Sequence, residues 1–266
     1  MDFKYGFVVS QQPAEYYMQF SRNNGLSHME IDLHKDHSLL PSFDTRRIEN
    51  LKKLAATYGV SFSVHPPYTL NLAEKNKALA QEQMDLLKQS IELARKLNAK
   101  FMTTYIGSVD NQKGLAAARS AALKRAIKAL EQALESCQKC SLKLAIENTN
   151  LMPKDSENFF LGDNLKDLAA VFKEIDSPLL NLCLDLGHAH VNEGIAKYID
   201  KFADKIISVH FHDNKGETDD HLDVGDGNIN WKAVMKAFAK IKYCGPFLSE
   251  TIDSPAQSKR KLLEYL

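Results

Sequence analysis

The sequence of 266 residues lacks several features that mark particular classes of protein. It contains only four cysteines, no apolar signal segment and no apolar stretch of membrane-spanning length, so we expect a cytoplasmic, reduced protein without a membrane partner. Cys137 and Cys140 form a CxxC pair, but no second pair accompanies it. The pair falls at the end of an expected helix, which is more typical of an ordinary helix end than of a zinc or redox site.

The sequence also lacks a charge excess of either sign. Lys plus Arg number 34 and Asp plus Glu number 34, so the formal net charge is zero. A protein that grips duplex DNA through its phosphates usually carries a basic excess or stripe. The basic clusters present here fall in expected helices and have the character of solvated helix faces. Nucleic acid is therefore disfavoured as a partner.

Short apolar runs alternate with amphipathic stretches along the whole sequence, and no glycine-rich dinucleotide fingerprint follows the first run. The runs predict eight strands, at 5–9, 28–31, 61–65, 100–106, 143–147, 181–185, 206–211 and 246–250. Helical spacing is clearest at 74–97 and 115–139, and a short last helix is expected near 254–265. Pro13, Asn164 and Asn230 stand where helices are expected to begin.

This alternation predicts an α/β protein with one domain, a single (β/α)8 TIM barrel over residues 1–266. The length suits a barrel, which typically needs about 250 residues. A doubly wound open sheet is the alternative. It is disfavoured because polar residues end strands throughout the sequence, and the first and last strands of an open sheet would not reach one site.

Polar residues end five of the apolar runs. They are His65, Glu147, Asp185, His210 and Glu250. Buried charged groups are costly unless they are paired, so five such endings indicate one shared polar centre at the carboxyl ends of barrel strands. Glu147, Asp185, His210 and Glu250 end four successive strands. Three carboxylates and one imidazole suit one divalent ion, Mn²⁺, Mg²⁺, Co²⁺ or Zn²⁺.

Further candidates surround this quartet. His188 follows Asp185 by three residues, and Asp219 and His221 are two residues apart in a later loop, so these three are candidate ligands of a second metal or contacts to substrate. His212 is two residues from His210 and points to the same side of an ideal strand. His212 therefore either lies beside the polar centre or is itself the ligand in place of His210. The candidate substrate contacts are His65, His188, Glu30 and Tyr105.

Together these segments resemble the xylose isomerase-like TIM-barrel superfamily over nearly the whole sequence. The segments that carry the resemblance are HPPYTLNLA (65–73), AIEN (145–148), DLGH (185–188), VHFHD (209–213), DDHLDVGDGN (219–228) and SET (249–251). The superfamily has a branch of sugar isomerases and epimerases with one catalytic metal, and an endonuclease IV-like branch with three zinc ions.

For the sugar branch, the resemblance implies that Glu147, Asp185, His210 and Glu250 are the metal ligands. For the nuclease branch it adds His65 beside Glu147, and His188 with Asp219 and His221. The sequence departs from the nuclease pattern at the end of the fourth strand, where Tyr105 stands in place of a second histidine. The nuclease-type opening motif after the first strand is also missing, and VVSQQ (8–12) stands there.

These observations predict a metal-dependent sugar or sugar-phosphate isomerase or epimerase. Glu147 and Glu250 would act as general base and general acid around a metal-stabilised enediolate, although sequence leaves proton transfer and hydride shift both open. One alternative is a multi-metal phosphodiesterase that cuts DNA at abasic sites. Another is a barrel that binds a sugar or metal without turnover. The expected partner is a small sugar or sugar phosphate, and the sequence is compatible with a homo-oligomer.

Overall fold

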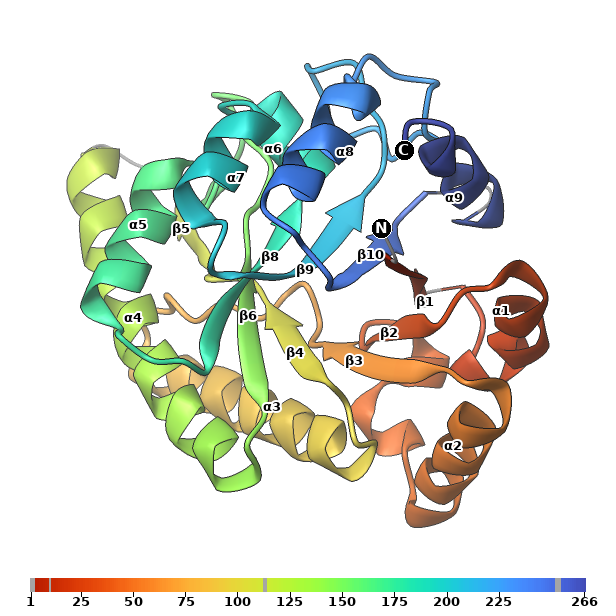
Figure 1. The fold of residues 1–266 in the computed structure, drawn as a ribbon. Helices are drawn as coiled ribbons and strands as arrows, with labels where there is room; N and C mark the ends of the chain where they lie inside the picture. Colours follow the sequence, from red (N-terminus) through yellow and green to blue (C-terminus); the bar gives the residue numbers. More distant parts are fainter. Residues whose placement is uncertain (1–2, 10, 112–113, 252–254) are drawn as a thin grey trace.

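In the computed structural model, eight parallel strands close into a barrel with helices around its outside (Figure 1). The structure describes residues 3–9, 11–111, 114–251 and 255–266. The barrel strands, in order around it, are β1 (Lys4–Val9), β2 (His28–Asp32), β3 (Ser61–His65), β4 (Phe101–Thr104), β6 (Lys143–Glu147), β8 (Leu180–Asp185), β9 (Ile206–Phe211) and β10 (Pro246–Ser249). β10 pairs with β1 and closes the ring. The predicted (β/α)8 barrel is confirmed, and the open sheet is wrong.

Helices follow the strands as a parallel barrel requires. The α-helices are α1 (Met18–Asn24), α2 (Thr45–Tyr58), α3 (Lys77–Lys96), α4 (Leu115–Cys140), α5 (Leu165–Glu174), α6 (Leu186–Val191), α7 (Ile195–Phe202), α8 (Trp231–Lys240) and α9 (Pro255–Leu263). Three short 3-10 helices are η1 (Ala14–Tyr17), η2 (Asp36–Ser38) and η3 (Leu40–Ser42). None of the helices in the described part of the chain combines the length and apolar character needed to cross a membrane.

Side-chain caps explain several helix boundaries. The Asn76 side chain accepts hydrogen bonds from two backbone N–H groups, so α3 starts after it rather than at the expected residue 74. Asn164 and Asn230 cap α5 and α8 as predicted. Pro13 precedes η1, a 3-10 turn that leads into α1. The expected last helix corresponds to α9, and its first expected residue, Ser254, lies outside the described residues.

Two strands outside the barrel were not expected from the sequence. β5 (Ser108–Asp110) and β7 (Asn158–Phe160) pair antiparallel as a small ribbon separate from the barrel. The expected strand 100–106 ends at Thr104, because the chain there leaves the barrel and turns into β5. The expected strand 246–250 ends at Ser249, which leaves Glu250 just beyond β10.

The interior of the barrel is divided by polarity one layer below its carboxyl end. On the side of β2, β3 and β4 the inward residues of this layer are Glu30, Ser63 and Thr103, all fully buried. On the side of β6, β8 and β10 they are Ala145, Cys183 and Leu248, which form an apolar cluster with Phe101. The polar half of the floor therefore lies on one side of the barrel axis.

Candidate functional site

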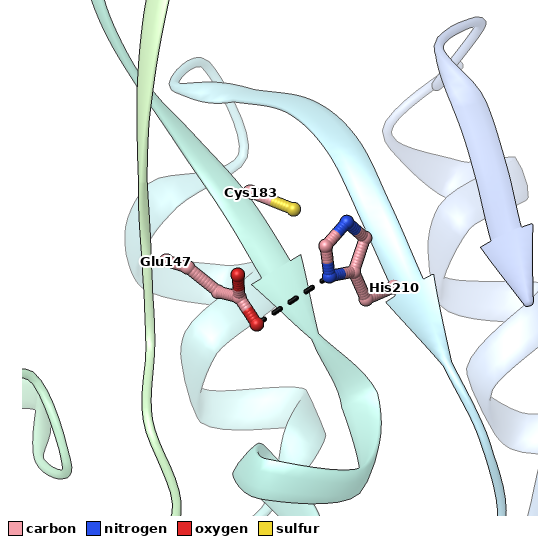
Figure 2. Close-up of side chains that lie close together, drawn as sticks. All are labelled: Glu147, Cys183 and His210. Carbon is pink, nitrogen blue, oxygen red and sulfur yellow. Dashed lines mark ion pairs between the residues drawn. The ribbon is translucent and has the colours of Figure 1, made fainter. Parts of the chain in front are cut away.

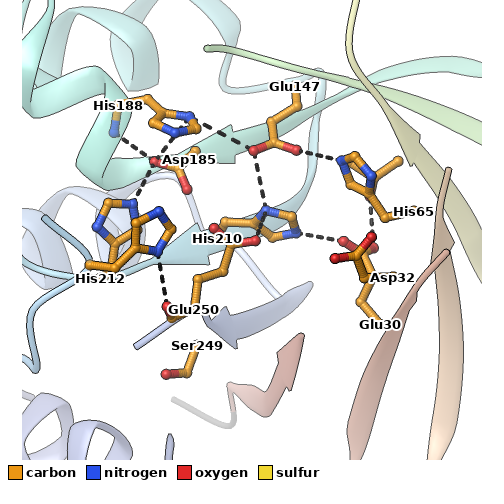
Figure 3. Close-up of polar contacts among 12 residues, drawn as sticks. Glu30, Asp32, His65, Glu147, Asp185, His188, His210, His212, Ser249 and Glu250 are labelled. Carbon is orange, nitrogen blue, oxygen red and sulfur yellow. Dashed lines mark hydrogen bonds and ion pairs between the residues drawn. The ribbon is translucent and has the colours of Figure 1, made fainter. Parts of the chain in front are cut away.

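The predicted quartet converges at the carboxyl end of the barrel (Figure 3). One ligand atom each from Glu147, Asp185, His210 and Glu250 lies within 4.8 Å of the others. His210 Nδ1 is 3.1 Å from Glu250 Oε1 and 3.4 Å from Glu147 Oε1. The strand register explains the convergence, because Asp185 pairs with His210, and the backbone N–H of Glu250 donates to Phe211 O. We call these four residues the strand centre.

Unsatisfied polar atoms in the strand centre are arranged as ligands of a cation would be. Glu147 Oε1, Asp185 Oδ2 and His210 Nδ1 are buried, and none has a hydrogen-bond partner among the described residues. Leaving buried carboxylate oxygens and imidazole nitrogens unpaired is costly, whereas a divalent ion would satisfy them together. The set of donor atoms thus fits a metal ion.

The electrostatics of the strand centre point the same way. Burial would raise the pKa of Glu147, but His210 and His65 outweigh it and lower that pKa. Burial likewise opposes ionisation of Asp185, yet the nearby His188 and His212 hold its pKa below the usual range. Burial would lower the pKa of His210, and the surrounding acidic groups instead raise it well above 6.5. Without a metal, the negative charge gathered here draws protons onto the imidazoles.

Cys183 lies in the floor of the strand centre, as Figure 2 shows. Its Sγ is within 4.8 Å of ligand atoms of Glu147 and His210. Burial raises the pKa of the thiol to about 12. A neutral thiol is a poor metal ligand at neutral pH, and this favours the oxygen and nitrogen quartet over a site that includes sulfur.

A second group of side chains lies beside the strand centre. We call His188, Asp219 and His221 the loop cluster. His188 Nε2 and His221 Nε2 lie 3.2 and 3.3 Å from the same oxygen, Asp219 Oδ2. In both imidazoles Nδ1 contacts a backbone carbonyl, Asn148 O for His188 and Glu250 O for His221. The three residues named together from the sequence therefore do meet, and both Nε2 atoms face the carboxylate.

His212 joins the strand centre to the loop cluster. It is fully buried, with Nε2 3.4 Å from Asp185 Oδ1 and 3.3 Å from Asp219 Oδ1, and its ring stacks on that of His221 at 4.0 Å. The sequence left open whether His210 or His212 belongs to the quartet. The structure places His210 in the strand centre and His212 between the two groups. The two-residue spacing between His210 and His212 had indicated that both rings lie on the same side of the strand.

The family model of the xylose isomerase-like TIM barrel matches residues 18–266. The chain belongs to this family. An uncharacterized protein of Methanocaldococcus jannaschii is 29% identical over 100% of this chain and 90% of its own length. Fructoselysine 3-epimerase of Shigella flexneri is 24% identical over 84% of this chain and 80% of its own. Probable endonuclease 4 proteins also align, at 23% to 26% identity.

Among solved structures, the chain is similar to a D-tagatose 3-epimerase-like protein. The two superpose with a TM-score of 0.87 and 26% identity over 99% of this chain and 97% of the other. The superposition covers the full barrel. It therefore includes the strand ends that carry the metal-ligand candidates of this chain.

Three side chains expected to contact substrate occupy different surroundings. His65 Nε2 lies 3.1 Å from Glu147 Oε2, and its Nδ1 contacts Pro66 O, so this ring borders the strand centre. The ring of Tyr105 packs edge-on against it at 4.8 Å. Glu30 is fully buried in the polar half of the barrel floor, and both its carboxylate oxygens lie against protein groups. This position disfavours the expected contact between Glu30 and substrate.

Analysis of the sequence did not identify Asp213, whose side chain holds the loop that carries Asp219 and His221. Its Oδ2 accepts from Gly225 N at 2.8 Å and from Trp231 Nε1 at 2.7 Å, and its Oδ1 accepts from Ile229 N at 3.2 Å. Because one buried carboxylate ties both ends of the loop, the loop is fixed against β9. Trp231 is buried at the start of α8.

The CxxC pair lies in the last turn of α4, where the sequence placed it. Cys137 is buried, Cys140 is half-buried, and both are free thiols. The Cys140 thiol contacts backbone carbonyls of its own helix. Among the described residues, neither cysteine belongs to a group of side chains that could hold a metal.

Proposed function

We propose that this protein is a divalent-metal-dependent epimerase or isomerase of sugars or sugar phosphates. The convergence of the strand centre carries the proposal, because four ligand atoms from four adjacent strand ends lie within 4.8 Å of one another. The similarity to fructoselysine 3-epimerase and to a D-tagatose 3-epimerase-like structure supports a sugar as the substrate.

Glu147, Asp185, His210 and Glu250 would together hold one ion, and Mn²⁺, Mg²⁺, Co²⁺ or Zn²⁺ suits this donor set. When bound, such an ion polarises a substrate carbonyl and offsets the negative charge that develops on its oxygen. The donor atoms need little adjustment to receive it, since they already face one another in the barrel mouth.

Glu147 and Glu250 would carry the protons. They approach His210 Nδ1 from two directions and come from strand ends that β8 and β9 separate. A substrate carbon between them would have a carboxyl group on each side. One carboxylate takes the proton from the carbon next to the carbonyl, and the C–H electron pair moves to form an enediolate. The other group, protonated beforehand, returns a proton to the opposite face and inverts the carbon.

The lowered pKa of Glu147 suits it to begin as the base, since it is then ionised at neutral pH. His65 and His188 border the strand centre from opposite sides and would orient substrate oxygens. By this proposal the chain supplies two proton carriers and two orienting imidazoles around one ion.

The loop cluster would hold either a second cation or a substrate oxygen. Two Nε2 atoms within 3.3 Å of one carboxylate oxygen require a positive charge, which either protons or a metal ion can supply. Without a metal, hydrogen bonds from His188 and His221 hold the pKa of Asp219 below its usual range against the effect of burial. Histidines that bind a metal commonly donate their other ring N–H to a backbone carbonyl, and the imidazoles of His188 and His221 both have a carbonyl in that position.

Hydrogen exchange tests the proposed chemistry. The protein loaded with Mg²⁺ or Mn²⁺ is incubated in D₂O with a panel of ketoses, aldoses and their phosphates, and the recovered sugars are examined by NMR. We expect deuterium on the carbon next to the carbonyl of at least one sugar. Glu250→Gln should lower the exchange rate by about 10²–10⁴-fold, the usual contribution of a general acid or base.

Retention of the fold by Glu250→Gln, seen by circular dichroism, is the control that separates catalysis from stability. Exchange at the wild-type rate in this variant would remove Glu250 from the reaction. Absence of exchange from the whole panel, with one equivalent of metal bound, would count against proton transfer.

A second candidate is phosphodiester cleavage at abasic sites in DNA. The meeting of His188, Asp219 and His221 favours it, because it offers a second metal position beside the first. Tyr105 counts against it, since burial raises the pKa of the phenol well above 10 and makes it a poor ligand where the nuclease pattern has histidine. Cleavage of a synthetic duplex with one abasic site, at a rate lost in Asp219→Ala, would favour the nuclease.

A further inference from the structure

A column of hydrogen-bonded side chains lies beneath the strand centre, in the polar half of the barrel floor. At its lower end the His28 ring contacts Ser61 Oγ through Nδ1 at 2.8 Å and Ser63 Oγ through Nε2 at 2.9 Å. Ser63 Oγ donates to Glu30 Oε2 at 2.7 Å. Because the only proton of Ser63 Oγ is used in this bond, His28 Nε2 must donate to Ser63. Burial lowers the pKa of His28 to about 4, so this ring is neutral.

The same contacts fix the ionisation of Glu30. Its Oε2 accepts from Ser63 Oγ and from Thr103 Oγ1, each at 2.7 Å. Hydrogen bonds donated to a carboxylate favour its ionised form, so these two hydroxyl groups stabilise the charged form of Glu30. With Oε2 of Glu30 held by two hydroxyl groups, its other oxygen, Oε1, lies against a different side chain.

That neighbour is the metal-ligand candidate His210. Its Nε2 lies 2.8 Å from Glu30 Oε1 as an ion pair, and neither atom has an aligned hydrogen-bond partner among the described residues. Two lone pairs this close in a buried site would repel each other, so a proton must lie on Nε2. His65, His188 and His221 differ, since each has Nδ1 against a backbone carbonyl. His210 alone among these four has a carboxylate behind its ring.

We propose that Glu30 is a positioning residue that keeps the proton of His210 on Nε2 and so leaves Nδ1 free as a ligand atom. The inference rests on the proposed metal-dependent function, and it gives Glu30 a role other than substrate contact. Carboxylates behind metal-bound histidines fix the ring and increase its basicity, and their loss typically costs 10–100-fold in metal affinity or activity. His28, Ser63 and Thr103 hold Glu30 in place for this purpose.

The ring proton and the metal affinity test the proposal independently of turnover. The Nε2–H of His210 is followed by ¹H–¹⁵N NMR of histidine-labelled protein, metal-free and loaded with Zn²⁺, with His210→Asn for assignment. We expect a protected Nε2–H in wild type in both states. Glu30→Leu should lose this signal to solvent exchange or shift it strongly, and should raise the Kd for Zn²⁺ by about 10–100-fold.

Glu30→Gln guards against a variant that does not fold. The amide oxygen still accepts from Nε2, so the Nε2–H signal should persist, while the missing charge should raise the Kd by about tenfold. Asp163→Asn is the matched control, because Asp163 is a buried carboxylate whose ion-pair partner is Arg119 and not a metal-ligand candidate. It should lower the melting temperature and leave both the His210 signal and the Kd unchanged.

Specific outcomes overturn the proposal. A His210 that carries its proton on Nδ1 in the Zn²⁺-loaded protein would do so, as would a Kd in both Glu30 variants within threefold of wild type. A wild-type protein that binds no metal would remove the proposed function instead. The Nε2–H response to Glu30→Leu in the metal-free protein would then still decide whether Glu30 sets the proton of His210.

Discussion

The strand centre and the loop cluster lie side by side, yet the fold holds them in different ways. In the strand centre, Glu147, Asp185 and His210 are on barrel strands, and their side chains are 0% exposed. In the loop cluster, Asp219 and His221 come from the loop after β9, and their side chains are 20% and 31% exposed. The first group is placed by hydrogen-bonded strand register, and the second by a loop that Asp213 ties down.

This difference shows where tolerance to change should lie. Register fixes the strand centre, so moving one ligand there requires distorting the barrel. The loop cluster depends on local contacts and on a left-handed backbone at His221, whose φ is 50°. A non-glycine residue in that conformation costs free energy, and the surrounding loop must supply it. Under the proposed function, we therefore expect the strand centre to carry the chemistry and the loop cluster to adjust affinity or specificity.

The largest expected effect compares one imidazole from each group. His210→Asn should lower turnover by more than about 100-fold, because even the loss of a group behind a metal ligand costs 10–100-fold. His221→Asn removes one polar contact, worth about 0.5–1.5 kcal/mol, and should lower turnover by about tenfold at most. Both variants are measured with the sugar identified by deuterium exchange, together with metal content by mass spectrometry.

The metal count separates the two groups further. We expect His210→Asn to lose the ion of the strand centre and His221→Asn to retain it. Equal losses of turnover in the two variants would contradict the division of roles. They would favour the multi-metal alternative, in which every ligand set is essential.

The strand centre could be predicted from sequence because each ligand ends an apolar run. A run such as Ala145–Glu147 indicates both that the strand is buried and that its last side chain is polar. A parallel barrel brings such endings to one face, so the fold and the quartet follow from a single pattern. The meeting of His188, Asp219 and His221 was visible only as short spacings within separate segments.

The remaining features depend on contacts between residues distant in sequence. Glu30 was expected to contact substrate from its place in the second strand, but only the closed barrel brings it against Thr103 of β4 and His210 of β9. Asp213 follows a histidine-rich strand end, and nothing local indicates that it accepts from Trp231. The β5–β7 ribbon pairs segments some 50 residues apart, and no sequence period marks such pairing.

Packing between α6 and His212 gives a smaller effect that acts on the loop cluster first. A Cβ at Gly187 would lie 1.9 Å from His212 Cε1, and that ring is held between Gly187 and His221. Gly187→Ala should therefore displace His212 and cost about 1–3 kcal/mol in the free energy of unfolding, as overpacking usually does. Urea unfolding gives the cost.

The metal content of the Gly187→Ala variant shows whether the strand centre also depends on His212. Gly187→Ala should leave the ion of the strand centre in place, because His210 and Glu147 do not contact the new methyl group. Loss of that ion would mean that His212 supports both groups equally. An unchanged free energy of unfolding would mean that the ring moves without cost and that the loop cluster is not tightly packed.

The pH dependence of stability again distinguishes the two groups. In the metal-free protein, contacts with Glu147 and Asp219 outweigh burial and raise the pKa of His65 and of His221 from 6.5 to about 9. Groups with a raised folded-state pKa stabilise the protein fully below 6.5, and this contribution is lost as the pH rises through about 9. The free energy of unfolding in urea, with a chelator present, should therefore fall between pH 6.5 and 9.

Saturating Zn²⁺ should flatten this pH dependence, since the ion replaces protons among the acidic groups. His221→Asn should remove only the part of the pH dependence that comes from the loop cluster. A flat profile in the metal-free wild type would show that the imidazoles are neutral without metal, and that the carboxylates of the strand centre are balanced in another way.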